Sequence, residues 1–346
     1  MTDLEKLCSR VTEAADCAVI TDDVNRRYFT AMKSSAGTLV VFPEKAYFII
    51  DFRYIEKAKK TVTACEVILQ DKLYEQINSL IEKHGAKTVS VNADTCTLSE
   101  LIAYQQKLNA EVIADTKLAE IIREIRTVKS QEQIDKIIKA QRIAEKGFAH
   151  MLDFIRVGRT EKEIQLELDY YMLKNGAEAL SFDTIALSGS NTSLPHGVPS
   201  DKKVESGEFV LMDFGATYDG WHSDMTRTVC VGKPSDKMKS VYETVLNAQL
   251  SALDAVKAGM SGKELDKIAR DIITDAGYGD NFGHSLGHGV GVEIHESPYA
   301  SPSREDILPE NSIVTVEPGI YLEGKFGVRI EAVSYTHLRA HETEAD

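Results

Sequence analysis

The sequence predicts two domains: an open α/β domain over residues 1–127, and a domain over residues 128–335 in which helices precede strands. Its length of 346 residues exceeds the ~250–300 at which a single core stops growing. Apolar, β-rich runs alternate with helical patterns over roughly the first 125 residues, as in βα units. Beyond the junction, helical stretches are followed by strands twice, which suggests an internal structural duplication.

The composition is that of a soluble protein, with 43% hydrophobic and 27% charged residues and a formal net charge of −14. This acidity argues against a nucleic-acid partner, which would need a basic surface. The five cysteines are scattered and form no CxxC pair, so we expect neither a disulfide framework nor a structural zinc site. The sequence shows no signal peptide and no apolar run of ~20 residues, so we expect a cytoplasmic protein without a membrane partner.

The α/β domain is predicted from its strands and one clear helix. The runs at 38–42 and 46–52 are apolar and β-rich, and the turn-forming residues 43–45 separate them. Residues 72–85 have the spacing of an amphipathic helix that stops at Gly85. The segment KTVSVNA, at 87–93, then predicts another strand, which completes a repeated βα pattern.

A charged helical stretch, REIRTVKSQEQIDKI, joins the two domains. Ser130 and Gln133 have the spacing of a capping box, so a new helix is expected to begin at Ser130, with the domain boundary near Thr127. In the second domain, residues 160–176 form a further helix, capped by Thr160 and ended by Gly176. A helical pair at 236–258 and 261–276 follows.

Two aspartates flank a predicted hairpin. Residues 209–212 and 221–231 are strands, and the turn at 218–220 lies midway between Asp213 and Asp224. The hairpin therefore places the two carboxylates opposite each other, within the ~5 Å of a cross-strand pair. Opposed like charges destabilise a sheet unless a cation lies between them. The alternative, two surface aspartates on opposite faces, remains open from this segment alone.

Two glutamates repeat this geometry near the C-terminal end. The strand at 313–316 leads into Glu317, the turn lies at 323–325, and the strand at 328–330 leads into Glu331. The midpoint of the two glutamates falls within the turn. Burying both in apolar strands without a cation would be very costly.

Three histidines lie between these hairpins, in a glycine-rich segment: His284, His288 and His295. Glycine allows the backbone to approach a site closely, and histidine is a common ligand and proton carrier. Four carboxylates with one imidazole suit two divalent ions, Mn²⁺ first, with Co²⁺ or Zn²⁺ as alternatives.

These motifs together resemble those of one superfamily. They are NRRYFTAMKSSAG, DFRY, REIRTVKSQEQI, SFDTIALSGSNTSLPHGVPSDK, LMDFGATYDGWHSDMTRT, GHSLGHGVGVEIHESP, VEPGIY and GVRIE. The chain resembles the creatinase/prolidase/methionine-aminopeptidase superfamily, and specifically its Xaa-Pro aminopeptidase and Xaa-Pro dipeptidase (prolidase) branch. The resemblance implies a creatinase/prolidase-like α/β N-terminal domain and an α+β pita-bread catalytic domain with a curved antiparallel sheet. We also expect a homodimer.

The resemblance further implies a role for each ligand. Asp213 would chelate one metal ion, Asp224 and Glu331 would bridge two ions, and His288 and Glu317 would complete the other.

Four more residues match positions around the metal site. His196 and His295 match positions that contact the substrate or the tetrahedral intermediate, and His284 matches a position that lines the pocket. Arg329 matches an arginine that stabilises the site by ion pairing. For His196 and His284, packing beside the site remains the alternative.

The implied activity is hydrolysis of the Xaa-Pro bond at the N-terminus of peptides or in dipeptides. A hydroxide that bridges the ions would attack the carbonyl carbon, with Glu317 as general base. His295 or His196 would donate a hydrogen bond to the oxyanion. The alternatives are a methionine aminopeptidase-like enzyme and an inactive binding protein on the same fold. Dipeptidase and aminopeptidase are not distinguished.

The sequence departs from the family pattern after Glu331. We expect no strand there, a weakly anchored Glu331, and a non-native tail over residues 336–346. His337 and His341 have the i, i+4 spacing of ligands, but we expect them to be tail residues without a role in the site.

Overall fold

The computed structural model describes residues 1–336, which form two compact units, Met1–Arg126 and a second unit from Thr127 onward. No helix among the described residues is long and apolar enough to cross a membrane.

The first unit is built on a six-stranded mixed sheet in the order β4-β3-β2-β1-β5-β6. Its strands are β1 Cys17–Ile20, β2 Thr38–Val41, β3 Ala46–Ile50, β4 Glu66–Leu69, β5 Thr88–Val91 and β6 Glu111–Ile113. Its helices are α1 Asp3–Arg10, α2 Asp23–Thr30, α3 Ile55–Thr61, α4 Leu73–His84, α5 Leu98–Lys107 and α6 Lys117–Thr127, with a short 3-10 turn, η1, at Val11–Glu13. Separate apolar clusters bury the two faces of the sheet, which explains the nearly continuous apolar strands.

The predicted elements of this unit are confirmed. Strands β2 and β3 pair in antiparallel fashion around the turn at 43–45, and β1 pairs in parallel with β5. In α4, the side chains of Ile77, Leu80 and Ile81 are buried, as the helical spacing predicts. Gly85 ends α4 with a φ of 67°, a left-handed conformation that glycine adopts without strain.

The second unit contains two successive groups of helices and strands. The first group is α7 Gln131–Phe154, α8 Glu161–Lys174, β7 Ala179–Leu180, β8 Ile185–Ser188, η2 Gly189–Ser193, β9 Glu208–Phe214, β10 Ala216–Tyr218, β11 Trp221–His222 and β12 Met225–Val231. The second is α9 Asp236–Ala255, α10 Gly262–Asp275, η3 Gly279–Asn281, β13 Gly287–Gly289, β14 Glu296–Ala300, β15 Ile313–Val316, β16 Gly319–Leu322, β17 Phe326–Arg329 and β18 Ala332–Tyr335. All of the strand pairs found among these residues are antiparallel.

Capping boxes begin the helices of this unit where the sequence predicts them. Ser130 caps α7 with Gln133 at the third helical position, and Thr160 caps α8 with Glu163. In each box the hydroxyl accepts a hydrogen bond from a backbone N–H that the first turn would otherwise leave unpaired.

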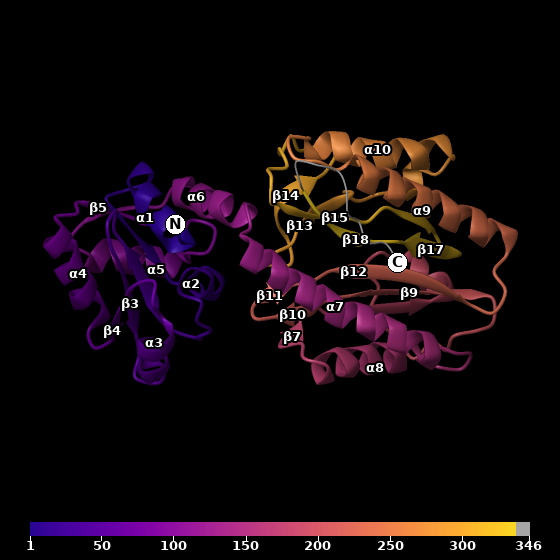
Figure 1. The fold of residues 1–346 in the computed structure, drawn as a ribbon, viewed down its shortest axis with the longest axis horizontal. Helices are drawn as coiled ribbons and strands as arrows, with labels where there is room; N and C mark the ends of the chain where they lie inside the picture. The colour runs from indigo at the N-terminus through magenta and orange to yellow at the C-terminus, as the bar shows by residue number, and fades with distance from the viewer. Residues whose placement is uncertain (337–346) are drawn as a thin grey trace. The chain divides into compact units, whose positions relative to one another are not determined.

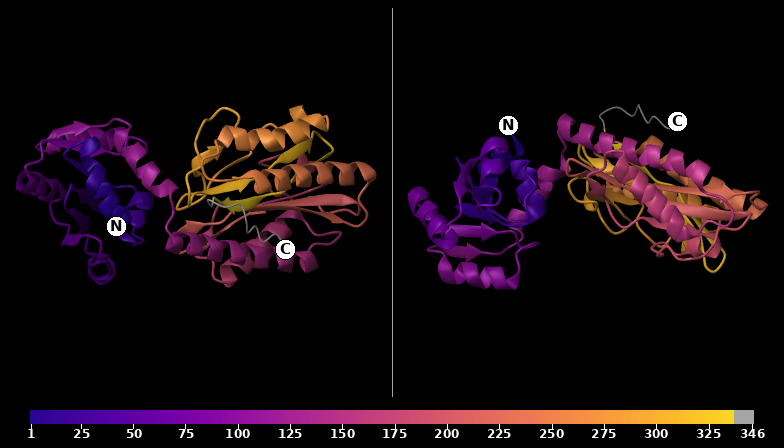
Figure 2. Two further views of the ribbon diagram at one scale, coloured as in Figure 1. Left: turned by 45° about the horizontal axis from the view of Figure 1, so that its top comes forward. Right: turned by 90° about the horizontal axis from the view of Figure 1, so that it is seen from below.

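The strands of the second unit lie between two helix pairs. Figure 1 shows α7 and α8 on one side of the strands and α9 and α10 on the other. One apolar cluster joins α7 and α8 to β8, β9 and β12, and another joins α9 and α10 to β15, β16 and β17. In the view from below, α7 and α8 cover the strands (Figure 2). Between these layers, β9, β13 and β17 carry the polar side chains of Asp213, His288 and Arg329.

Residues 313–335 form one long interrupted hairpin. Ile313 pairs with Tyr335 in β15 and β18, and Gly319 pairs with Arg329 in β16 and β17, so both pairings share a single register. The expectation that no strand follows Glu331 is wrong, since β18 occupies Ala332–Tyr335. The pattern is hard to recognise because only Ser334 of this strand is fully buried.

Thr336, which the sequence analysis assigns to the tail, is part of the folded domain. Its side chain is buried, and its backbone N–H donates to the carbonyl oxygen of Ser312 at 3.0 Å, which extends the β15–β18 pairing. The remainder of the expected tail, with His337 and His341, lies outside the described residues.

Candidate metal centre

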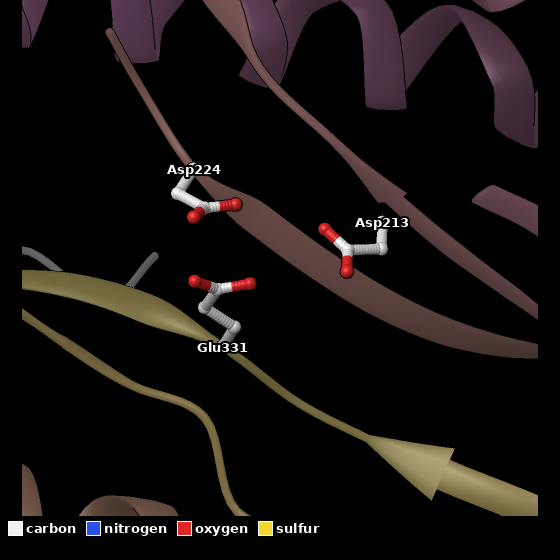
Figure 3. Close-up of side chains that lie close together, drawn as sticks. All are labelled: Asp213, Asp224 and Glu331. Atoms are coloured by element: carbon white, nitrogen blue, oxygen red, sulfur yellow. The ribbon is translucent and has the colours of Figure 1, made fainter. Parts of the chain in front are cut away.

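Three buried or nearly buried carboxylates converge in the second unit. Asp213 comes from β9, Asp224 from the segment between β11 and β12, and Glu331 from the segment between β17 and β18. One oxygen of each lies within 4.8 Å of the others. Figure 3 shows the carboxylate of Glu331 facing those of both aspartates across the strands. Residues distant in the sequence therefore form one compact group of potential ligands.

His288 and Glu317 complete the group. The Nε2 atom of His288 lies 3.3 Å from Oε1 of Glu317 and 3.6 Å from Oδ2 of Asp224. His288 is the central residue of β13, and Glu317 directly follows β15. The structure thus brings together all five residues that the sequence predicts as ligands.

Glycines allow the strand that carries His288 to approach its neighbours. A Cβ atom on Gly287 would lie 1.9 Å from the carbonyl oxygen of Thr315, and one on Gly289 would lie 2.4 Å from that of Ser297. No larger residue fits at either position without moving the backbone. The two glycines therefore set the depth at which the imidazole lies.

The predicted opposition of the two aspartates is wrong by two residues. Asp213 pairs with Thr226, not with Asp224, because the turn is centred on Asp219 and Gly220, both of which have positive φ. A shift of two residues keeps a side chain on the same face of a strand, so Asp224 is a diagonal neighbour of Asp213. The two carboxylates still meet for this reason.

The predicted opposition of the two glutamates agrees with the register. Gly319 pairs with Arg329, and extending that register by two residues places Glu317 opposite Glu331. A hydrogen bond from the Ile330 N–H to the Pro318 carbonyl oxygen, at 3.4 Å, continues the ladder toward them. The interruption between the paired segments leaves both side chains free to turn toward the aspartates.

Burial and mutual repulsion dominate the electrostatics of the acidic cluster. Burial, reinforced by the charge of Glu331, raises the pKa of Asp224 well above its ordinary value. Burial also raises the pKa of Glu331 well above its ordinary value, and the charges of Glu317 and Asp213 add to the effect. Both shifts show that the site disfavours negative charge in the absence of a cation, and a bound cation would relieve this.

Glu317 and His288 behave as an ion pair within this cluster. Burial alone would raise the pKa of Glu317, but the hydrogen bond and charge of His288 lower it. Burial alone would lower the pKa of His288, but the same interaction raises it. Thr315 also donates a hydrogen bond from Oγ1 to Glu317 at 2.9 Å. Glu317 is therefore the acidic residue best prepared to be ionised.

One oxygen of the cluster lacks a hydrogen-bond donor. Among the residues that the structure describes, Oδ1 of Asp213 is buried and accepts no hydrogen bond. A buried, unsatisfied carboxylate oxygen is costly unless a cation binds it. Together with a donor set of four carboxylates and an imidazole, this oxygen fits divalent metal ions of the Mn²⁺, Co²⁺ or Zn²⁺ kind.

Arg329 links the cluster to its surroundings. Its Nη2 donates to Oδ2 of Asp213 at 2.5 Å, and its Nη1 donates to the hydroxyl of Tyr321 at 2.8 Å. Its Nε donates to Oγ1 of Thr226 at 3.1 Å, and Thr226 donates in turn to Oε2 of Glu331 at 2.8 Å. One guanidinium group therefore orients two of the acidic residues.

The three further histidines lie around the cluster in different environments. His284 contacts the hydroxyl of Tyr321 through Nε2 at 2.9 Å, and burial lowers its pKa. The ring of His295 lies 4.3 Å from that of His288, centroid to centroid, and partial burial lowers its pKa. The charge of His196 acts on both His284 and His295, which places His196 near them.

Sequence reasoning missed three polar residues of the site: Thr226, Thr315 and Tyr321. Thr226 and Thr315 bind ligand carboxylates through their hydroxyl groups, and Tyr321 joins Arg329 to His284. The signal for the threonines is that each lies two residues from a predicted ligand along its strand, on the same face. Tyr321 gives no such signal, because its contacts depend on segments far apart in the sequence.

Comparison with known families assigns both parts of the chain to a family. Residues 135–336 match the family described as Metallopeptidase family M24, and residues 4–128 match the Creatinase/Prolidase N-terminal domain. The Xaa-Pro dipeptidase of Pyrococcus furiosus is 39% identical over 331 residues, which cover 95% of this chain and 93% of that protein. A Bacillus subtilis protein named as the uncharacterized peptidase YqhT is 44% identical over 320 residues, 91% of this chain and 89% of its own length.

Solved structures give the same assignment. The Xaa-Pro dipeptidase from Bacillus anthracis superposes with a TM-score of 0.95 at 40% identity, covering 99% of this chain and 97% of that one. The X-Pro aminopeptidase from Thermotoga maritima gives a TM-score of 0.86 at 39% identity, with 92% of each chain covered. The predicted architecture, a creatinase-type N-terminal domain followed by a pita-bread domain, is confirmed. The chain belongs to metallopeptidase family M24.

Proposed function

We propose that this chain hydrolyses the peptide bond that precedes a proline, in Xaa-Pro dipeptides or at the N-terminus of longer peptides. Relatives that cover nearly the whole chain are named Xaa-Pro dipeptidase or X-Pro aminopeptidase, which supports this substrate class. The observation that carries the proposal is the cluster of four carboxylates around His288, in which one buried oxygen of Asp213 lacks a donor.

The cluster is proposed to hold two divalent ions, with Mn²⁺ as the first choice. Asp213 would bind one ion, His288 and Glu317 the other, and Asp224 and Glu331 would bridge them. When bound, such ions supply Lewis-acid activation of water and of the substrate carbonyl. The donor set contains no thiolate, which agrees with a catalytic rather than a structural metal site.

Glu317 is proposed as the general base. Its interaction with His288 lowers its pKa despite burial, so the carboxylate is ionised near neutral pH and can accept a proton from water. Thr315 and His288 both contact Oε1 of this carboxylate, at 2.9 and 3.3 Å. Glu317 would then deliver this proton to the proline nitrogen, which has no hydrogen of its own in the peptide and must gain one to leave.

His196 and His295 are proposed to bind the substrate. Both residues are exposed, and a charge on His196 contributes to lowering the pKa of His295. Neutral imidazoles can donate a hydrogen bond to the oxygen that becomes negative in the transition state. The lowered pKa of His295 favours this neutral form at neutral pH. His284 is more enclosed, and it supports the site through Tyr321.

A matched pair of substitutions tests the metal site and the activity together. Asp224→Asn removes a proposed bridging ligand, whereas Asp219→Asn removes an exposed carboxylate from the turn of the same hairpin. We expect wild type and Asp219→Asn to bind two ions per chain and release proline from an Xaa-Pro dipeptide in Mn²⁺. Asp224→Asn should lose metal and activity. A wild-type protein that binds no metal and cleaves nothing in Mn²⁺ would refute the proposal.

Substrate length distinguishes the remaining alternatives. Cleavage of an Xaa-Pro tripeptide excludes a strict dipeptidase, and failure on the tripeptide excludes an aminopeptidase. Cleavage of a Met-Ala peptide, without any Xaa-Pro cleavage, would instead indicate a methionine aminopeptidase-like enzyme. Light scattering tests the proposed homodimer, and cell fractionation tests the proposed cytoplasmic location.

A further inference from the structure

Glu161 is a buried carboxylate far in sequence from the metal ligands. It is the first residue of α8, and its side chain is completely buried. A carboxylate at this depth is costly unless hydrogen bonds satisfy both oxygens. Its partners therefore indicate what it does.

Each oxygen of Glu161 binds one end of the same segment. Oε1 accepts hydrogen bonds from the backbone N–H and the hydroxyl of Ser188, at 2.7 and 3.2 Å, and from Nδ2 of Asn191 at 3.0 Å. Oε2 accepts from the backbone N–H and the hydroxyl of Ser200, at 3.0 and 2.6 Å. A single side chain thus joins the start and the end of residues 188–200, which we call the His196 loop.

The His196 loop reaches the metal cluster at its tip. The Gly197 N–H donates to the Leu194 carbonyl oxygen at 3.1 Å, which closes a tight turn with His196 inside it. The neighbouring carbonyl oxygen of Pro195 accepts from Nη1 of Arg329 at 3.3 Å. Leu194, His196 and Val198 are exposed, so the tip has little packing of its own to fix it.

We propose that Glu161 is a positioning residue that sets the place of His196 over the metal cluster by holding both ends of the His196 loop. This proposal rests on the role proposed above for His196. The carboxylate is required because it accepts five hydrogen bonds and donates none. A glutamine at 161 would turn an NH₂ group toward one end of the loop, where the backbone N–H of Ser188 or Ser200 would lose its acceptor.

Glu163 provides a matched control on the same helix. Its carboxylate takes part in the capping box of α8 with Thr160, and its side chain is 46% exposed. Both residues place negative charge in the first turn of α8, which stabilises a helix. A general loss of helix stability would therefore appear in both Glu161→Gln and Glu163→Gln, whereas a loss of loop position would appear only in the former.

Hydrogen exchange tests the loop without requiring activity. In the full chain, Glu161→Gln should raise deuterium uptake in peptides from residues 188–200, and Glu163→Gln should leave it at the wild-type level. Ser200→Ala removes one hydroxyl and keeps the carboxylate of Glu161, so it should raise deuterium uptake by a smaller amount. This variant replaces Glu161→Gln in the test if Glu161→Gln does not fold. Unchanged uptake in the folded Glu161→Gln protein, or in Ser200→Ala when that variant stands in, would overturn the proposal.

A double-mutant cycle then tests whether Glu161 acts through His196. With metal content measured in each protein, Glu161→Gln should lower kcat/KM on an Xaa-Pro dipeptide about tenfold to hundredfold, the range expected for a misplaced substrate-binding group. In a His196→Ala background the same change should cost less than about twofold, since coupled residues are not additive. Equal losses in both backgrounds would overturn the proposal. If wild type cleaves no Xaa-Pro peptide, the proposed function fails, and hydrogen exchange still decides the role of Glu161.

Discussion

Arg329 and Asp213 lie on different strands and meet through a hydrogen bond of 2.5 Å from Nη2 to Oδ2. Burial would lower the pKa of Arg329, but the acidic groups around it, Tyr321 and Asp213 first, raise it well above its ordinary value. The guanidinium therefore remains charged, and it leaves the second oxygen of Asp213 buried without a donor. Partners of this kind orient metal ligands.

Replacing Arg329 should weaken metal binding. Arg329→Met removes the donor to Asp213 and leaves that carboxylate unpaired, so we expect Mn²⁺ affinity to fall by about 10- to 100-fold. Arg329→Lys keeps the charge, but an ammonium group cannot reach several acceptors as a planar guanidinium does. The Mn²⁺ affinity of Arg329→Lys should therefore lie between the affinities of wild type and Arg329→Met. Calorimetric titration with Mn²⁺ measures both. Wild-type affinity in Arg329→Met would show that Asp213 is held by other contacts.

A buried ion pair near the start of the second unit should contribute strongly to stability. Nζ of Lys129 lies 2.7 Å from Oε1 of Glu296, and the two side chains are 0% and 6% exposed. Lys129→Met should therefore lower the free energy of unfolding by ~3–5 kcal/mol, because the substitution removes a cation that lies 2.7 Å from the buried carboxylate of Glu296. Urea denaturation measures this loss.

Two comparisons make the Lys129 prediction specific. Lys136→Met removes a lysine that pairs with the exposed carboxylates of Glu132 and Asp219, and it should cost ~1 kcal/mol or less. The double variant Lys129→Met, Glu296→Gln should recover part of the lost stability, since it removes both charges of the pair. A Lys129→Met protein as stable as Lys136→Met would contradict the assignment.

The hydroxyl of Thr336 should anchor the end of the long hairpin. It accepts from the Ser312 N–H at 3.0 Å and donates to the Pro309 carbonyl oxygen at 2.6 Å. Thr336→Val keeps the shape and removes both hydroxyl hydrogen bonds, but the Ser312 N–H still donates to the Pro309 carbonyl oxygen at 3.3 Å, so we expect a loss of ~1 kcal/mol. Thr336→Ser keeps the hydroxyl and should lose less. Thermal unfolding of the two variants decides the point, and equal melting temperatures would refute it.

Cys17 should make stability depend on pH above neutrality. Burial raises the pKa of this thiol from 9.0 to about 12. Because the folded pKa is the higher one, the stabilisation is complete below pH 9 and is lost as the pH rises from 9 to about 12. Within that window we expect a loss of ~1.4 kcal/mol per pH unit from this residue.

The variant Cys17→Ala isolates this contribution. It should show a shallower fall in the free energy of unfolding from pH 9 upward than wild type, whatever its stability at neutral pH. Cys230→Ala removes a partly exposed thiol, so its free energy of unfolding should fall with pH more nearly as that of wild type does. Identical slopes for wild type and Cys17→Ala would show that the thiol ionises equally in the folded and unfolded chains.

Much of the fold and the ligand set follows from local patterns in the sequence. The helix starts at Ser130 and Thr160 are set by capping boxes, which involve residues only three apart. The opposition of Glu317 and Glu331 follows from their equal distances from the turn at Gly324. Both inferences succeed because the interacting residues are linked through short, regular segments.

The aspartate pair shows how a small error in a turn propagates. Asp213 would oppose Asp224 if the turn were centred between Tyr218 and Asp219, whereas the two residues with positive φ are Asp219 and Gly220. Asp-Gly is a strong signal for a two-residue hairpin turn, and using it would have paired Asp213 with Thr226. The sequence therefore contained the information for the correct register.

Other features depend on contacts that local patterns do not encode. The Pro195 carbonyl oxygen accepts a hydrogen bond from Arg329, 134 residues away, and Thr226 donates one to Glu331, 105 residues away. Glu161 resembles an ordinary acidic residue in the first turn of a helix, and only the three-dimensional approach of residues 188–200 gives it another role. Such contacts are products of packing, so they require the structure.

The shared register of residues 313–335 determines where this chain can change in length. A residue inserted between Glu317 and the turn would move Glu317 one step along its partner and rotate it to the opposite face of the strand. An insertion at Gly324 would instead lengthen the loop and leave both glutamates in place. The hairpin thus tolerates insertions at its turn, but insertions within its paired strands would displace a glutamate from the site.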